Sequence, residues 1–168
     1  APPPISIMPG MSGWRGRGPI AGAGRCFHSG AKHGATPMAH LRGLHHAAII
    51  CSDYDRSRAF YTDTLGLTVL AENFREERGS WKLDLGLPDG SQVELFSFPD
   101  PPARASRPEA RGLRHLAFAV SDVADMKTRL EARGIAVEDI RIDPYTGCRF
   151  TFFRDPDDLP LELYEVAR

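Results

Sequence analysis

The feature that most constrains this chain is an internal repeat. Residues 43–48 (GLHHAA) recur sixty-nine positions later as residues 112–117 (GLRHLA), and each copy runs on into a Ser-Asp pair. Further along, residues 93–96 (VELF) match residues 161–164 (LELY). Self-similarity of this kind is typical of a duplicated structural unit. The sequence therefore predicts two copies of one module.

Both copies predict the same order of elements: a strand, a helix and three more strands. Residues 44–51 are apolar and β-prone, Asp53 suits the N-cap of a helix over 55–65, and Gly66 suits the position after it. Strands are then expected over 67–74, 80–86 and 91–98. In the second copy we expect a strand over 113–120, a helix over 122–133, and strands over 135–141, 148–154 and 159–165.

The predicted fold class is therefore α+β, with two βαβββ modules. We place the folded domain at residues 41–168, with module one at 43–98, a proline-rich linker at 99–111 and module two at 112–166. Residues 1–40 contain eight Gly and six Pro and no acidic residue. This composition predicts a disordered N-terminal extension or a transit peptide. A transit peptide would send the chain to a plastid or mitochondrion, and otherwise a cytoplasmic location is expected.

Composition limits the classes of partner. The formal net charge of −1 provides no general attraction to nucleic acid or to an anionic membrane. No apolar run approaches the roughly 20 residues that a membrane-spanning helix needs.

Four side chains at duplicated positions predict a metal centre. Side chains alternate faces along a strand, so His115 lies opposite the large apolar residues of its strand, and the repeat places His46 in the same way. Glu94 and Glu162 each lie between two apolar residues of a strand, which is unfavourable unless the carboxylate has a partner. We therefore expect these four residues to hold one divalent ion.

Two imidazoles and two carboxylates suit several divalent metals. Zn²⁺ and Ni²⁺ are the first expectation, and Co²⁺, Mn²⁺ and Fe²⁺ are compatible with the same donors. One or two waters would complete the coordination shell and leave the metal open for chemistry. His45 has the opposite parity and Arg114 as its repeat counterpart, so it is interpreted as a surface residue or a neighbour of the ligands.

These residues resemble the vicinal oxygen chelate (VOC) superfamily, and most of all its glyoxalase I-like (lactoylglutathione lyase-like) members. The resemblance covers residues 43–166. It is carried by Leu44-His45-His46, Phe60-Tyr61 before Leu65-Gly66, Val93-Glu94-Leu95, Arg114-His115-Leu116-Ala117, and Asp155-Pro156-Asp157 before Leu161-Glu162-Leu163. It implies paired modules forming a curved mixed sheet, often in a homodimer, and the His/Glu/His/Glu order of metal ligands.

The resemblance also implies a reaction. Glyoxalase I, an enzyme of methylglyoxal detoxification, isomerises the hemithioacetal of an α-oxoaldehyde and a thiol, with glutathione as the usual co-substrate. By analogy, the metal would stabilise an enediolate while a glutamate moves a proton between adjacent carbons. Glu162 is the implied base, with Glu94 as its counterpart.

Two positions depart from the glyoxalase I pattern. Ile50 stands where those enzymes have an arginine that holds glutathione, and Phe98 stands where they have an asparagine. Arg104, Arg107 or Arg149 are candidates to supply the missing contact. Our expected substrate contacts in the cup are Arg149, Phe96 and Tyr164.

Other functions within the superfamily stay open. One is a different metalloenzyme, such as an epimerase of acyl thioesters or a thiol transferase acting on antibiotics. Another is a binding protein that sequesters a small molecule, although such members generally lose the ligands that this chain keeps. Ring-cleaving dioxygenases lack a carboxylate at the position of Glu94, which argues against that class.

Overall fold

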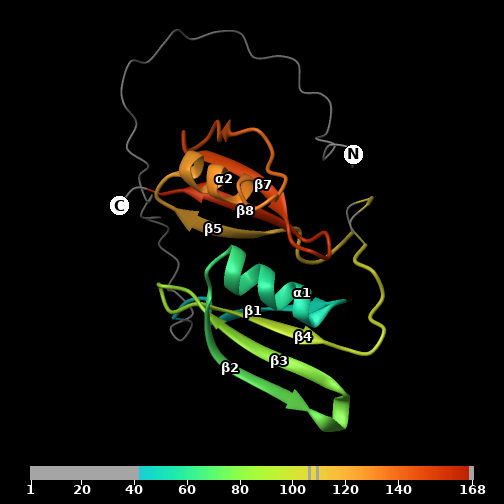
Figure 1. Cartoon of the computed structure of the whole chain (residues 1–168). Helices are drawn as coiled ribbons and strands as arrows, with labels where there is room; N and C mark the ends of the chain where they lie inside the picture. The colour runs from blue at the N-terminus through green and yellow to red at the C-terminus, as the bar shows by residue number, and fades with distance from the viewer. Residues whose placement is uncertain (1–41, 106, 109, 167–168) are drawn as a thin grey trace, which may run out of the picture.

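The computed structural model describes residues 42–105, 107–108 and 110–166 (Figure 1). Module one contains β1 (His46–Cys51), α1 (Tyr54–Ala59), a π-helical turn η1 (Phe60–Thr64), β2 (Thr68–Arg75), a short 3₁₀ turn η2 (Glu76–Arg78), β3 (Ser80–Gly86) and β4 (Gln92–Ser97). Module two contains β5 (Leu116–Val120), α2 (Val123–Glu131), β6 (Arg141–Ile142), β7 (Arg149–Arg154) and β8 (Pro160–Glu165). The extension predicted over residues 1–40 lies outside the described residues.

The two modules share one topology. Their sheets have the strand orders β1-β4-β3-β2 and β5-β8-β7-β6. The first strand of each module pairs in parallel with the last, β1 with β4 and β5 with β8, and all other pairings are antiparallel. This confirms the predicted fold class of two βαβββ modules. None of the helices in the described part of the chain is long and apolar enough to cross a membrane.

The ends of the helices follow the sequence signals. The Asp53 carboxylate accepts a hydrogen bond from the Arg56 backbone N–H at 3.0 Å, and Asp122 accepts from the backbone of Ala124 at 2.8 Å. Such N-caps satisfy backbone donors that have no partner within the helix. Gly66 and Gly134 adopt φ values of 76° and 78°, a region that favours glycine over residues with a side chain.

The first helix widens where the chain enters the core. The Leu65 N–H donates to the Phe60 carbonyl at 3.0 Å, five residues back, so the last turn is π-helical. A widened turn re-aims consecutive side chains. Both Phe60 and Tyr61 are consequently buried, with 7% and 0% of their surface exposed.

One predicted strand is much shorter than expected. The prediction of strand over residues 135–141 is wrong for most of its length, because β6 spans only Arg141–Ile142. The preceding residues follow β7 with few ladder bonds: the Glu138 N–H donates to the Phe152 carbonyl at 2.8 Å. The Lys127 ammonium donates to the Glu138 carbonyl at 3.1 Å, and the Thr151 hydroxyl donates to the same carbonyl. Side-chain donors therefore replace part of the hydrogen bonding between strands.

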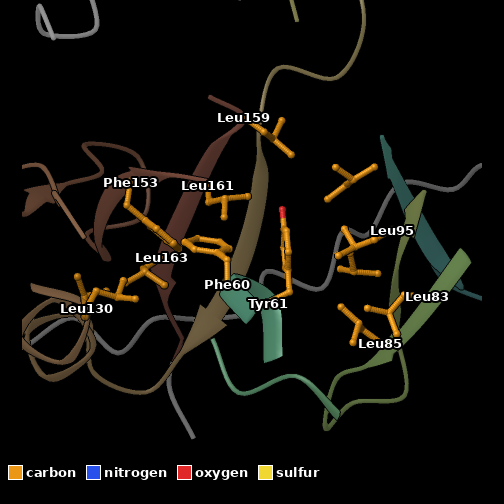
Figure 2. Packing of buried hydrophobic residues seen from close by; sticks show 13 residues of the cluster. Phe60, Tyr61, Leu83, Leu85, Leu95, Leu130, Phe153, Leu159, Leu161 and Leu163 are labelled. Carbon is orange, nitrogen blue, oxygen red and sulfur yellow. The ribbon is translucent and has the colours of Figure 1, made fainter. Parts of the chain in front are cut away.

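A single hydrophobic cluster joins the two modules. It combines Leu83 and Leu95 from one sheet with Leu161 and Leu163 from the other, and Phe60 lies between them (Figure 2). Figure 1 likewise shows α1 between the two sheets. The helix-covered faces of the sheets therefore turn toward each other, and their opposite faces turn outward.

The turn before β8 fastens the second module to the first. The Tyr61 hydroxyl donates to the buried Asp155 carboxylate at 3.0 Å. The Asp157 carboxylate accepts from the Ser52 N–H at 2.9 Å and from Arg56 at 3.4 Å. The motif Asp155-Pro156-Asp157 is thus a contact between modules as well as a turn.

Candidate metal centre

The four predicted ligands lie on the outward faces of the sheets. Glu94 pairs with Ala48 in β1 and Asp84 in β3, so its side chain shares the face of His46 and lies opposite the buried Val93 and Leu95. Glu162 pairs with Ala117 and Phe152, opposite the buried Leu161 and Leu163. Each carboxylate has a small alanine beside it on that face, and the side chains of Glu94 and Glu162 are 13% and 12% exposed.

The first pair is His46 and Glu94. His46 Nε2 lies 3.7 Å from Glu94 Oε2. The other imidazole nitrogen, Nδ1, contacts Nδ1 of His45 at 3.0 Å, so one of these two atoms is the donor. The Lys82 ammonium donates to Glu94 Oε1 at 3.0 Å and also to Asp84. These contacts leave His46 Nε2 and Glu94 Oε2 facing each other.

The second pair is His115 and Glu162, in a more apolar setting. His115 Nε2 lies 3.1 Å from Glu162 Oε2, and the Phe152 ring stands edge-on to the imidazole at 5.3 Å. His115 Nδ1 is buried and has no hydrogen-bond partner among the described residues. Burial raises the pKa of Glu162, and the nearby His115 and Arg141 oppose that rise.

The two pairs do not meet within one chain. In the described part of the chain, no group of three or more His, Cys, Asp or Glu side chains is arranged to hold a metal ion. The reason is the packing of the modules: the helix-covered faces meet in the shared core, so each His–Glu pair lies on the far side of its own sheet. Sequence reasoning placed all four residues at one point, and the single chain brings them together two by two.

The expected substrate contacts divide between the two faces. Phe96 lies on the outward face, two residues from Glu94, and Tyr164 lies on the corresponding face of module two, where its hydroxyl donates to Asp143 at 2.9 Å. Arg149 does not lie on the outward face, which corrects our expectation. It pairs with Glu165 at 2.7 Å and lies 3.6 Å from Asp122 at the start of α2, on the helix side of the sheet.

Arg104, another candidate for the missing glutathione contact, also has a structural role. Arg104 donates to the backbone carbonyls of Leu113 and Arg114, so it orders the linker. Sequence reasoning missed Arg75 at the end of β2, which shares the outward face of module one with Lys82 beside Glu94. Arg75 precedes the charged run Glu76-Glu77-Arg78, which as a sequence is typical of a solvated turn.

An apolar cavity of about 470 Å³ lies elsewhere, at the junction of the modules. Its lining includes Leu67, Leu70 and Leu87 from module one and Phe118 and Met126 from module two. None of the four predicted metal ligands lines it, so it is a separate feature from the outward faces.

Comparison with known proteins identifies the family. The family model for the Glyoxalase/Bleomycin resistance protein/Dioxygenase superfamily matches residues 43–163. "Uncharacterized protein YwkD" of Bacillus subtilis is 61% identical over 125 residues, which cover 74% of this chain and 98% of that protein. The crystal structure of the glyoxalase family protein from Enterococcus faecalis is 46% identical with a TM-score of 0.70, over 74% of this chain and 98% of that one.

Two more distant structures differ in their stated roles. Lactoylglutathione lyase from Agrobacterium tumefaciens is 26% identical, with a TM-score of 0.57 over 75% of this chain and 95% of that one. TnmS3, an antibiotic binding protein from a Streptomyces species, is also 26% identical, with a TM-score of 0.58 over 76% of this chain and 98% of that one. The fold therefore serves both roles at similar distances from this chain.

Proposed function

Because the chain belongs to the Glyoxalase/Bleomycin resistance protein/Dioxygenase superfamily, we propose that it is a divalent-metal-dependent lyase or isomerase of the glyoxalase type. Its substrate would be the hemithioacetal of an α-oxoaldehyde and a thiol. The observation that carries this proposal is the presence of two His–Glu pairs, one on the outward face of each sheet, with the nitrogen and oxygen of each pair facing each other.

A second copy of the chain would complete the centre. In a twofold-symmetric dimer, module one of each protomer would lie against module two of the other. The His46–Glu94 pair of one copy would then meet the His115–Glu162 pair of the other, which gives two equivalent centres. The first strand supports such a contact: Ile50, on the face of His46, is 55% exposed, and Leu44 just before β1 is 70% exposed. Exposed apolar groups beside a site favour an interface there.

The donors present fit a divalent metal. Each pair offers an imidazole nitrogen and a carboxylate oxygen, a set that suits Zn²⁺ or Ni²⁺ first and also Co²⁺, Mn²⁺ or Fe²⁺. Lys82 and His45 hold the far atoms of Glu94 and His46, which is how neighbouring groups orient metal ligands. When bound, such an ion supplies Lewis-acid polarisation of the substrate oxygens.

The two glutamates would take different parts in the reaction. Glu94 has a fixed cationic partner in Lys82, whereas Glu162 has aromatic surroundings and a pKa raised by burial. Glu162 would therefore be the base, taking the proton from the thiol-bearing carbon and returning it to the adjacent carbonyl carbon. The hydroxyl proton passes from the first oxygen to the second, which leaves an α-hydroxy thioester.

One experiment tests the proposal as a whole. The purified protein is analysed for bound metal and for mass in solution, and thioester formation from methylglyoxal and glutathione is then followed with each divalent metal. Glu162→Gln should abolish turnover, and Glu131→Gln on the exposed face of α2 should leave it unchanged. Absence of turnover with every metal would refute the glyoxalase assignment.

A sequestering role is the alternative that a specific observation favours. The face of Glu162 carries Phe150, Phe152 and Tyr164, with Phe150 stacked on Tyr164 at 6.5 Å, which is a surface suited to a flat ligand. The antibiotic binding protein TnmS3 has the same fold. Tight binding of a planar aromatic compound without metal and without turnover would favour this role over catalysis.

A further inference from the structure

Arg75 lies on the outward face of module one, among aromatic rings. It ends β2 and pairs with Ser80 of β3, which lies two residues before Lys82 on the same face. Its guanidinium carbon is 4.7 Å from the centre of the Phe96 ring and 5.2 Å from that of Phe98. Its Nη2 donates to Ser80 Oγ at 2.6 Å. Stacking and this hydrogen bond hold the guanidinium in one place.

This half-buried charge has no anionic partner. Among the described residues, no carboxylate lies within ion-pair distance of Arg75, and its Nε is buried without a hydrogen-bond partner. Burying a charge is costly unless it is paired. Arg141 on module two provides the contrast, because it stacks on Phe150 at 4.9 Å in the same way but pairs with Glu138 at 2.9 Å.

The position of Arg75 relates it to the candidate metal centre. Phe96 follows Glu94 by two residues on β4, which places its side chain about 7 Å further along the same face. Lys82 lies between them: its ammonium is 3.0 Å from Glu94 Oε1 and 5.8 Å from the centre of the Phe96 ring. The face therefore runs from the metal ligand, across one aromatic ring, to a fixed guanidinium.

We propose that Arg75 is an anion-binding subsite of this face. It takes a carboxylate or a phosphate at the end of the ligand remote from the reacting carbons, while the intervening part of the ligand lies over Phe96. A guanidinium matches such oxyanions through paired N–H donors. The substrate part of this inference rests on the proposed function, whereas the binding of an oxyanion at Arg75 does not.

The first test uses the protein without added metal or substrate. Inorganic phosphate and, in parallel, acetate are titrated at constant ionic strength while the ¹H–¹⁵N signals of the arginine Nε–H groups are recorded. A saturable shift of the Arg75 signal, lost in Arg75→Gln, is the expected result with either anion. Arg78→Gln removes an equal charge three residues away and should leave that shift intact. Equal, unsaturable shifts of all arginine signals would overturn the proposal.

The second test concerns the substrate. Arg75→Gln should raise KM roughly ten- to hundredfold for the hemithioacetal of glutathione, as expected for a charge-assisted hydrogen bond, with kcat almost unchanged. KM for the hemithioacetal of the uncharged 2-mercaptoethanol should not change. Arg75→Lys, which keeps the charge, should recover part of the loss. Equal effects on both substrates would overturn the substrate assignment.

The two tests separate the two ideas. Saturable phosphate binding at Arg75 with no turnover under any metal would leave the subsite standing and refute the glyoxalase function. Turnover with an unchanged KM in Arg75→Gln would leave the glyoxalase function standing and refute the subsite's role in it.

Discussion

Replacing Tyr61 by phenylalanine tests how the modules are joined. The Tyr61 side chain is fully buried, and its hydroxyl donates to Asp155 Oδ2 at 3.0 Å. The other oxygen of Asp155 accepts the backbone N–H groups of Asp157 and Leu159 at 2.9 and 2.8 Å. Tyr61→Phe therefore leaves Oδ2 without its protein donor, in a carboxyl that is only 7% exposed.

The loss of this bond should cost about 2 kcal/mol of the free energy of unfolding, the usual value for a hydrogen bond to a charged group. In urea this corresponds to a fall in the midpoint on the order of 1 M, with the slope unchanged. Tyr54→Phe is the matched control. Its hydroxyl donates to the exposed Glu72 at 2.6 Å, and water can replace that bond, so we expect a loss below about 0.5 kcal/mol.

The cost of Tyr61→Phe should depend on pH. Burial raises the pKa of Asp155, while the hydrogen bonds from Leu159 and Tyr61 lower it. A carboxyl whose pKa is raised by folding stabilises the fold below its unfolded pKa and loses that contribution as pH rises through the folded value. Removing the hydroxyl raises the pKa of Asp155 in the folded state further. The difference in the free energy of unfolding between variant and parent should therefore be largest at pH 7 and decrease in acid.

Urea unfolding of the three proteins at pH 7 and at pH 4 measures both effects. A Tyr61→Phe midpoint within error of the parent at pH 7 would refute the idea that this bond joins the modules. A loss of equal size at both pH values would refute the assignment of the effect to the charged form of Asp155.

Further outcomes follow from other contacts. Leu161→Ala, at a fully buried position in the shared core, should lower the free energy of unfolding by about 2–5 kcal/mol in denaturant titrations. Arg149→Ala should leave the unfolding midpoint almost unchanged, because its ion pairs are partly exposed, and should not change KM in steady-state assays. Ile50→Asp should yield a monomer by light scattering and weaken metal binding by calorimetry; a stable dimer with unchanged affinity would contradict the proposed assembly.

The duplication made much of the fold predictable. Caps at Asp53 and Asp122 and glycines at positions 66 and 134 were readable because each is a local requirement of the backbone. The prediction for the stretch before β6 was wrong because its apolar spacing resembles that of a strand. In the structure, the side chains of Lys127 and Thr151 donate to its Glu138 backbone carbonyl. Only a folded chain brings such side chains to that segment.

Differences between the two copies were harder to interpret from sequence. In register, Tyr61 of the first helix corresponds to Leu130 of the second, yet the phenol reaches Asp155 of the other module. Arg149 is in a strand next to apolar residues, and this local sequence does not indicate which acidic side chain is its ion-pair partner. Arg75 lies over two aromatic rings that are about twenty residues away in sequence.

By itself, the sequence determined two equivalent modules and, within each, a histidine and a glutamate on the face opposite the apolar residues. The alternation of side chains along a strand is a local property, so periodicity is enough to assign the face. Tertiary structure decided how the two modules pack. Burial of Leu83, Leu95, Leu161 and Leu163 around Phe60 turned the helix-covered faces inward, and this long-range packing sent the two His–Glu pairs to opposite outer surfaces.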